Sequence, residues 1–247
     1  MNKTAIIIPS RLEAVRLPNK PLELINNKEM ILHVYDAAIK TNLGDVYVAT
    51  PDQKIINLIK DNGGKAIKTS LSHQTGTDRV YEVFKNQLKS EPNIVINLQG
   101  DMPNIDPKDI ANLISYMYER KCDIGTLASS FSSDKEIADI NNVKVAVNDP
   151  LTNNQFDQAI DFFRKDEKKY EYFYHHVGIY AFTNKALVRY VSLNRSKLEL
   201  ERKLEQLRAL ENSMTIHVGY INSSPLSVDT KNDLMEVRKI MEKNEKN

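Results

Sequence analysis

The chain has 247 residues, of which 27% are charged, and its formal net charge at pH 7 is only +1. A chain of this length can bury roughly 70–75% of its unfolded surface, so it needs no disulfide or structural metal to fold. The single cysteine, Cys122, excludes an intramolecular disulfide and a cysteine-based zinc cluster. The near-neutral charge offers no global field that would attract nucleic acid or an anionic membrane.

The N-terminal apolar run, residues 5–8, is far too short for a signal peptide or a spanning helix. We therefore expect a soluble, cytoplasmic protein without a nucleic-acid or membrane partner. No linker, repeat or low-complexity segment interrupts the sequence. One domain over residues 1–247 is the simplest organisation.

Short apolar runs alternate with amphipathic segments through the first half of the chain. The runs of strand length are residues 5–8, 46–49, 66–68 and 94–98. The helical patterns are residues 28–40, 53–61 and 77–88, and a further helix starts at Asp106-Pro107 with Asp106 as N-cap. This order predicts an α/β fold with a doubly wound, mostly parallel sheet that is covered on both faces.

The second half of the chain has a different pattern. Residues 143–147, 158–163 and 172–182 indicate strands without helices between them, as in an antiparallel arrangement. We expect an inserted antiparallel subregion over about residues 143–212. A charged amphipathic helix is predicted over residues 198–210, a strand over 215–220, and a last helix from Thr230.

Three cations occupy the loop after the first predicted strand. Arg11, Arg16 and Lys20 fall within ten residues, and Pro18-Asn19 suits the centre of a type II turn that aims Arg16 and Lys20 inward. Ligands of such sheets bind outside the carboxyl ends of the strands, which favours an anion site over a solvated basic loop. The absence of a GxGxxG or Walker A pattern disfavours dinucleotide and P-loop proteins.

Two aspartates are candidate metal ligands. Asp101 follows the strongly apolar strand at residues 94–98, beside Gly100. Thr230 and Asp233 form a variant of a capping box, which does not need the preceding Asp229. Magnesium takes few carboxylates together with phosphate oxygens and water, so Asp101 and Asp229 are sufficient. The structural alternatives are a turn aspartate and a plain helix cap.

The run Pro-Ser-Arg-x5-Leu-Pro-x-Lys-Pro-Leu resembles the phosphate-binding loop of sugar nucleotidyltransferases, specifically the cytidylyltransferases that activate 3-deoxy-manno-octulosonate and sialic acid. The resemblance implies a nucleotide-diphospho-sugar transferase-like fold. It implies catalytic roles for Arg11, Lys20, Asp101 and Asp229, with Asp101 and Asp229 holding Mg²⁺. The implied contacts to the nucleotide are made by Arg11, Arg16, Lys20, Gly76, Thr77, Arg79 and Gln99.

Two segments of the second half narrow the resemblance to the octulosonate branch. They are His-Val-Gly-Ile-Tyr at residues 176–180 and Leu-Glu-Gln-Leu-Arg at residues 204–208. The implied sugar contacts are Gln99, Arg164, His176, Tyr180, Glu205 and Gln206. A packed histidine is the alternative for His176, and simple exposure is the alternative for Glu205 and Gln206. His175 faces the other side of its strand, and we expect it at a dimer surface or in solvent.

The resemblance implies transfer of CMP from CTP to the acidic eight-carbon sugar 3-deoxy-D-manno-octulosonate (KDO) for lipopolysaccharide synthesis, by a homodimer. Three alternatives stay open. They are a cytidylyltransferase for a related sugar acid (amino-octulosonate or sialic acid), a glycosyltransferase, and a non-catalytic nucleotide-binding relative. A glycosyltransferase would need an Asp-x-Asp pair, whereas residues 99–101 carry one acid. The non-catalytic alternative arises because Ala14-Val15 stands where the family has Ser-Thr, and Met102 replaces a glutamate.

Overall fold

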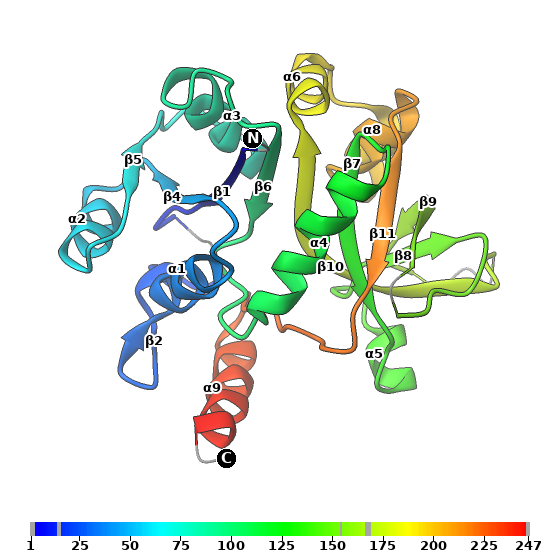
Figure 1. Cartoon of the computed structure of the whole chain (residues 1–247). Coiled ribbons are helices and arrows are strands. Elements are labelled where there is room, and N and C mark those ends of the chain that lie inside the picture. Colours follow the sequence, from blue (N-terminus) through cyan, green and yellow to red (C-terminus); the bar gives the residue numbers. More distant parts are fainter. Residues whose placement is uncertain (1–2, 14–15, 154, 166–168, 246–247) are drawn as a thin grey trace. The chain divides into compact units, whose positions relative to one another are not determined.

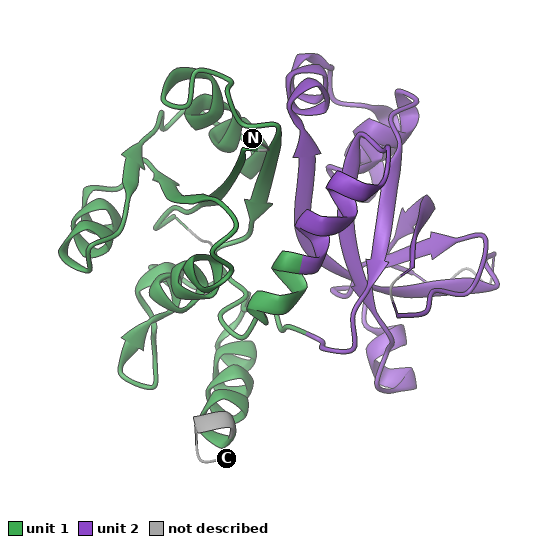
Figure 2. Cartoon of the chain, viewed as in Figure 1, with its two compact units in different colours: residues 1–111, 225–247 green, residues 112–224 purple. Residues whose placement is uncertain are grey.

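The computed structural model describes residues 3–13, 16–153, 155–165 and 169–245 (Figure 1). The chain divides into two compact units, residues 1–111 with 225–247, and residues 112–224 (Figure 2). The chain passes from the first unit to the second within helix α4 (Pro107–Glu119). The expected single domain with an insertion at about residues 143–212 stays a prediction.

The first unit is built on a parallel sheet with the strand order β5-β4-β1-β6. The strands are β1 (Thr4–Pro9), β4 (Asp45–Thr50), β5 (Ala66–Lys68) and β6 (Ile94–Leu98). The helices are α1 (Met30–Lys40), α2 (Gln53–Asp61), α3 (Gly76–Asn86) and the C-terminal α9 (Lys231–Glu245). A short 3₁₀ helix, η1 (Lys20–Leu22), and a small hairpin of β2 (Leu24–Ile25) and β3 (Lys28–Glu29) connect β1 to α1.

The direction of the chain reverses at β1. The steps from β1 to β4 and from β4 to β5 run one way, and the step from β5 to β6 returns past β1. Right-handed crossovers then place α1 and α3 on opposite faces, as Figure 1 shows. Every residue of β1 and β6 is buried, as expected for strands covered on both sides. The predicted α/β class with a mostly parallel sheet is confirmed.

One apolar cluster ties the loop after β1 to the C-terminal segment. It contains Leu17, Ile25, Met30, Val228, Leu234 and Val237. Leu17 follows Arg16 and Val228 precedes Asp229 in the sequence, so this cluster holds the backbone next to both charged residues. Burial of these side chains contributes roughly 1.5–3 kcal/mol each.

The second unit carries a mixed sheet with the order β10-β7-β11-β9-β8, in which β8 also pairs with β10. Its strands are β7 (Ile124–Ser129), β8 (Lys144–Val147), β9 (Phe156–Phe163), β10 (Tyr172–Thr183) and β11 (Ile216–Tyr220). Only β7 and β11 are parallel neighbours. The helices that lie wholly in this unit are α5 (Asp134–Ala138), α6 (Asn184–Ser192), α7 (Lys197–Arg202) and α8 (Leu207–Glu211).

The last turns of α4 pack closely on this mixed sheet. A Cβ added to Gly219 would lie 2.8 Å from the ring of Tyr116, and one added to Gly125 would lie 2.6 Å from Sδ of Met117. Tyr116 also stacks on Phe156 at 5.1 Å between ring centroids. Glycine at both positions therefore lets the helix approach β7 and β11.

Most predicted elements of the first half are confirmed to within a few residues. The N-cap of α4 is also confirmed, because Asp106 Oδ1 accepts the Lys108 amide at 2.8 Å. The single helix expected over residues 198–210 is wrong. The chain leaves the helix at Lys203, whose φ is 55°, and resumes as α8 at Leu207. Strand β7 and helices α5 and α6 were not predicted.

Cys122 is buried, and this burial raises the pKa of its thiol to about 12, which fits a structural residue. Within the part of the chain that the structure describes, no helix combines the length and the apolar character needed to span a bilayer.

Candidate functional site

A cavity of about 360 Å³ lies at the carboxyl ends of β1 and β6 in the first unit. Its lining comes from the loop after β1, the segment that leads into α3, the residues after β6, and Asp229. The strands β1 and β6 are neighbours on either side of the reversal in chain direction, which is the place where open α/β sheets bind ligands. The predicted residues Arg11, Arg16, Lys20, Gly76, Arg79, Gln99, Asp101 and Asp229 all line this cavity.

The loop after β1 contains the expected turn. Asn19 has φ 58° and ψ 21°, and the Lys20 amide donates to the Leu17 carbonyl at 3.2 Å. These values fit the type II turn predicted from Pro18-Asn19. A second bond, from the Asn19 amide to the Leu12 carbonyl at 3.2 Å, closes the loop. Ala14 and Val15, where the sequence departs from its family, lie outside the described residues.

Asp101 and Asp229 are brought together by backbone hydrogen bonds. The Val228 amide donates to the Asp101 carbonyl at 2.9 Å, and the Leu226 amide donates to Asn104 Oδ1 at 3.0 Å. Asp233 Oδ2 accepts the amides of Asp229 and Thr230, at 2.9 and 2.7 Å, so Asp233 satisfies the helix start. The Asp229 side chain is thus not needed for the cap and lines the cavity, as the sequence indicated.

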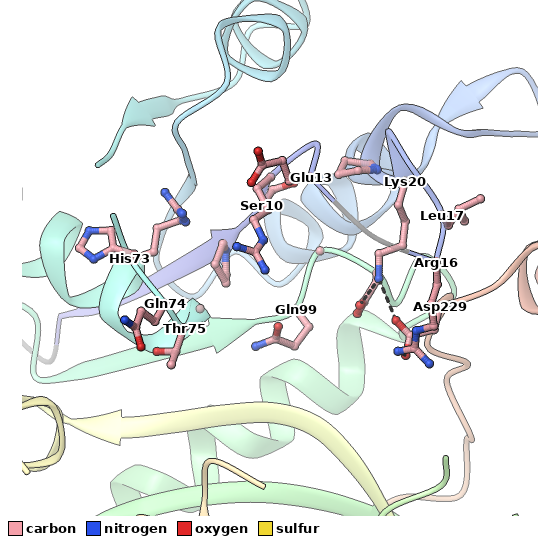
Figure 3. Close-up of a pocket in the computed structure, with 17 residues that line it drawn as sticks. Ser10, Glu13, Arg16, Leu17, Lys20, His73, Gln74, Thr75, Gln99 and Asp229 are labelled. Atoms are coloured by element: carbon pink, nitrogen blue, oxygen red, sulfur yellow. Dashed lines mark hydrogen bonds and ion pairs between the residues drawn. The ribbon is translucent and has the colours of Figure 1, made fainter. Parts of the chain in front are cut away.

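The Lys20 ammonium lies between the carboxylates of Asp101 and Asp229. Figure 3 shows its contact with Asp229. Its Nζ is 2.8 Å from Asp101 Oδ2 and 3.2 Å from Asp229 Oδ1, and Arg16 Nη2 is 2.8 Å from Asp229 Oδ2. Burial alone would lower the pKa of Lys20, but Asp101 and then Asp229 raise it above its ordinary value. The two carboxylates therefore form a pair that holds a cation.

The start of α3 closes another side of the cavity. The helix begins at Gly76, one residue before the predicted start, because Thr75 is its N-cap and Thr75 Oγ1 accepts the Asp78 amide at 3.2 Å. A Cβ on Gly76 would lie 3.3 Å from Pro9, so glycine lets the helix end approach β1. Thr77 is buried, and its hydroxyl accepts from the Asn97 side chain.

Arg79 is a buried cation in the cavity wall. Its Nη1 donates to the hydroxyl of Thr69 and to the Ser70 carbonyl. Burial and then the nearby Arg11 lower the pKa of this guanidinium. Arg11 itself is exposed at the cavity, so the two arginines give it a positive character that suits phosphate groups.

Two residues of the cavity lining, Ser10 and His73, were not among the predicted site residues. The Ser10 hydroxyl is buried, with the residue 8% exposed, and it has no hydrogen-bond partner among the described residues. His73 lines the cavity, and its Nε2 lies 2.5 Å from Glu82 Oε2. For Ser10 the available signal was its position between the end of β1 and Arg11. The partner of His73 is Glu82, nine residues further along the chain, and no sequence motif links the two residues.

Three of the predicted sugar-binding residues, Arg164, His176 and Tyr180, make contacts within the second unit. His176 is 8% exposed, its Nε2 lies 2.9 Å from the Thr126 hydroxyl, and its ring meets Phe162 and Tyr180. Burial lowers its pKa to about 3, so the ring is neutral at physiological pH. Arg164 donates to the carbonyls of Ile140 and Asn141. The structure thus describes the packed histidine that the sequence left open, and the sugar contacts of these residues stay predictions.

Glu205 and Gln206 do not lie inside a helix, which corrects the sequence prediction. They occupy the turn between α7 and α8, where Gln206 is buried and the Glu205 carbonyl accepts the Tyr190 hydroxyl at 2.8 Å. The solvent location considered for His175 is also wrong, whereas its place at a dimer surface stays a prediction. Its Nδ1 lies 2.9 Å from Glu136 Oε1, and its ring stacks on Phe131, so neighbours in the same unit cover most of the side chain.

Fold and site together define an α/β protein with an anion-binding cavity and a paired-carboxylate centre at the reversal point of its parallel sheet. The cytidylyltransferase family profile matches residues 5–216. The 3-deoxy-manno-octulosonate cytidylyltransferase of Brucella ovis is 41% identical over 238 residues, which cover 96% of this chain and 94% of that protein. The protein of the same name from Brucella anthropi is also 41% identical, over 96% of this chain and 95% of its own length.

A solved structure of CMP:2-keto-3-deoxy-manno-octonic acid synthetase complexed with CTP has a TM-score of 0.88 and 37% identity, and it covers 98% of this chain and 100% of that one. A Leptospira borgpetersenii cytidylyltransferase has a TM-score of 0.64 at 16% identity, over 98% of this chain and 87% of that one, which supports the fold alone. The chain belongs to the cytidylyltransferase family.

Proposed function

We propose that this enzyme transfers CMP from CTP to 3-deoxy-D-manno-octulosonate and releases pyrophosphate. The names of its relatives and the CTP complex of the similar synthetase support this substrate pair. The observation that carries the proposal is the cavity itself, in which four cations, Arg11, Arg16, Lys20 and Arg79, accompany the paired carboxylates of Asp101 and Asp229. Such an arrangement suits a nucleoside triphosphate with a bound cation.

The reaction needs positioning and charge neutralisation more than covalent help from the protein. The anomeric 2-hydroxyl oxygen of the sugar attacks the α-phosphorus of CTP and forms the new P–O bond. The bond from the α-phosphorus to the oxygen that bridges to the β-phosphate breaks, and its electron pair leaves with pyrophosphate. The hydroxyl proton passes to water. Arg11, Arg16 and Lys20 stabilise the negative charge that grows on the leaving group.

The donor set fits a divalent metal ion, because Asp101 and Asp229 already hold the Lys20 ammonium between them. We propose Mg²⁺ as the cofactor and these two aspartates as its protein ligands, with phosphate oxygens and water completing the shell. When bound, the ion would neutralise phosphate charge and lower the pKa of the attacking hydroxyl. Within the described residues there is no group of three or more acidic, histidine or cysteine side chains that could hold a metal alone.

A pyrophosphate-release assay tests the proposal. Purified protein is incubated with CTP, Mg²⁺ and KDO, and the sugar nucleotide is identified by mass spectrometry. UTP in place of CTP, and sialic acid or an amino-octulosonate in place of KDO, are the controls. Pyrophosphate release that requires CTP and KDO together supports the proposal, and faster turnover of another sugar acid would reassign the substrate.

Binding of CTP without turnover of any of these sugar acids would instead favour a non-catalytic relative. A homodimer and a cytoplasmic location stay predictions from the sequence. Light scattering of the purified protein would measure the oligomeric state directly. A role in lipopolysaccharide synthesis follows only if the product is CMP-KDO.

A further inference from the structure

In this structure the cation between Asp101 and Asp229 is the ammonium group of Lys20, which lines the same cavity. Lys20 Nζ contacts Asp101 at 2.8 Å and Asp229 at 3.2 Å, and the Lys20 side chain is only 16% exposed. The ammonium therefore occupies the place between the acids from which a metal ion would contact both. Two positive ions at one pair of carboxylates repel each other strongly at such distances.

We infer that Lys20 acts as a tethered cation that keeps free metal ions out of the acid pair until CTP arrives. The inference rests on the proposed function, because it gives Lys20 two successive partners. In the free protein the ammonium neutralises Asp101 and Asp229. When CTP enters, the ammonium turns to the phosphates, and the acids receive the metal ion that the nucleotide carries.

The surroundings of Lys20 allow its ammonium group to change partners by a movement of the side chain alone. Lys20 follows the type II turn at Pro18-Asn19, and Leu17 anchors that turn in the apolar cluster with Val228. The backbone around the turn and around Asp229 is thus fixed, while the ammonium sits at the end of a flexible four-carbon stem. A change of partner needs rotation of one side chain and no movement of the loop.

Arg16 provides a contrast within the same cavity. Of the two carboxylates it contacts only Asp229, and its side chain is 57% exposed. Water screens such a pair, so Arg16 competes with a metal ion less than Lys20 does. The structure therefore assigns the exclusion of free metal mainly to Lys20.

The consequence is that metal and nucleotide bind cooperatively. An ion that meets the free protein has to displace the ammonium, whereas an ion that arrives with CTP finds the ammonium already turned to phosphate. Coupling of this kind is reciprocal, so Mn²⁺ should strengthen CTP binding by the factor by which CTP strengthens Mn²⁺ binding. Substitution of Lys20 should reduce that factor.

The experiment measures Mn²⁺ binding to the full chain without nucleotide, by the loss of the free Mn²⁺ signal in electron paramagnetic resonance. The proteins are the wild type, Lys20→Met, and the double variant Lys20→Met with Asp101→Asn. Lys65→Met is the matched control, because Lys65 pairs with Asp45 at 2.7 Å outside the cavity. Circular dichroism confirms that each variant is folded, and Lys20→Gln replaces Lys20→Met if the latter is not.

We expect Lys20→Met to bind Mn²⁺ at least about tenfold more tightly than the wild type, equal to about 1.4 kcal/mol. The double variant should lose this gain, and Lys65→Met should match the wild type. With CTP but without sugar, the wild type should remove more free Mn²⁺ than the same CTP removes without protein. Equal Mn²⁺ affinity in Lys20→Met and wild type overturns the inference, and so does a gain that survives Asp101→Asn. The Mn²⁺ measurement needs no turnover. If it gave the expected result while the CMP-transfer assay failed, only the proposed function would be contradicted.

Discussion

Glu199 and Arg208 form a buried ion pair with two hydrogen bonds that joins α7 to α8. Arg208 Nε donates to Glu199 Oε2 at 2.8 Å, and Nη2 donates to Oε1 at 2.6 Å. Burial works to raise the pKa of Glu199, but Arg208 and the Ser196 amide hold that pKa below its ordinary value. The Arg208 guanidinium also lies over the Tyr190 ring. This pair fixes the turn that carries Glu205 and Gln206.

We predict that Glu199→Gln lowers the free energy of unfolding by about 3 kcal/mol, because it leaves the buried Arg208 without its counter-ion. Urea denaturation followed by far-UV circular dichroism measures the change. The control is Glu201→Gln in the same helix, whose partner Lys197 lies 3.8 Å away in an exposed pair. That variant should change the unfolding free energy by less than about 0.5 kcal/mol. Equal losses in both variants would contradict the structural role of the buried pair.

Asp101→Asn should reduce kcat for CMP transfer by roughly a thousandfold, since it removes one of the two charges proposed to hold the metal ion. The assay is pyrophosphate release at saturating CTP and KDO. Asp106→Asn is the matched control, because Asp106 caps α4 outside the cavity and asparagine caps helices equally well. A kcat within tenfold of the wild type for Asp101→Asn would remove Asp101 from the mechanism.

Local chemistry explains which parts of the structure were predictable. The turn at Asn19, the N-cap at Asp106 and the capping box at Thr230 each depend on residues within a few positions of one another. Strand β7 was not predicted, because its sequence Ile-Gly-Thr-Leu-Ala-Ser is rich in small residues and carries no clear strand period. Pairing with β10 and β11 places it inside the sheet, and α4 covers it at Gly125.

Distant pairings explain what the sequence could not provide. The helical pattern over residues 198–210 is genuine, but Lys203 breaks it without a glycine or proline to mark the end. The bond from the Val228 amide to the Asp101 carbonyl, which brings the two acids together, joins the two sequence segments that make up the first unit. The family resemblance predicted that Asp229 joins Asp101 at one metal ion, and the fold supplies the hydrogen bond that brings the two segments together.

Ser10→Ala should weaken CTP binding by about tenfold without lowering stability. The Ser10 hydroxyl is buried in the cavity lining with no partner among the described residues, so the free protein loses no hydrogen bond when it is removed. A bound nucleotide would give it a partner, and one hydrogen bond contributes about 0.5–1.5 kcal/mol. Isothermal titration calorimetry and urea denaturation provide the two measurements.

Ser129→Ala is the matched control for Ser10→Ala. The Ser129 hydroxyl is also buried but donates to Ser224, and it lies outside the cavity. This variant should lose stability and keep its affinity for CTP. If Ser10→Ala instead lost stability and bound CTP normally, the hydroxyl would be a structural group and not a ligand contact.

His176 should make the protein less stable as the pH falls. Burial, and then the nearby His175, lower the pKa of His176 from 6.5 to about 3. Below pH 6.5 the unfolded chain therefore binds a proton at His176 that the folded protein does not bind. The contribution of His176 to the free energy of unfolding is complete above that pH and declines toward pH 3. At about 1.4 kcal/mol per pH unit, the loss between pH 6.5 and about 5 is about 2 kcal/mol.

The measurement compares urea denaturation of the wild type and His176→Gln across this pH range. Glutamine keeps a polar group near the Thr126 hydroxyl but does not titrate, so the variant should lack about 2 kcal/mol of the wild-type pH dependence. Other histidines with lowered pKa, such as His217, titrate in both proteins and cancel in the difference. Parallel stability curves would mean that His176 binds its proton in the folded state. A charged His176 could then pair with a sugar carboxylate, whereas the neutral ring described here can offer only an uncharged hydrogen bond.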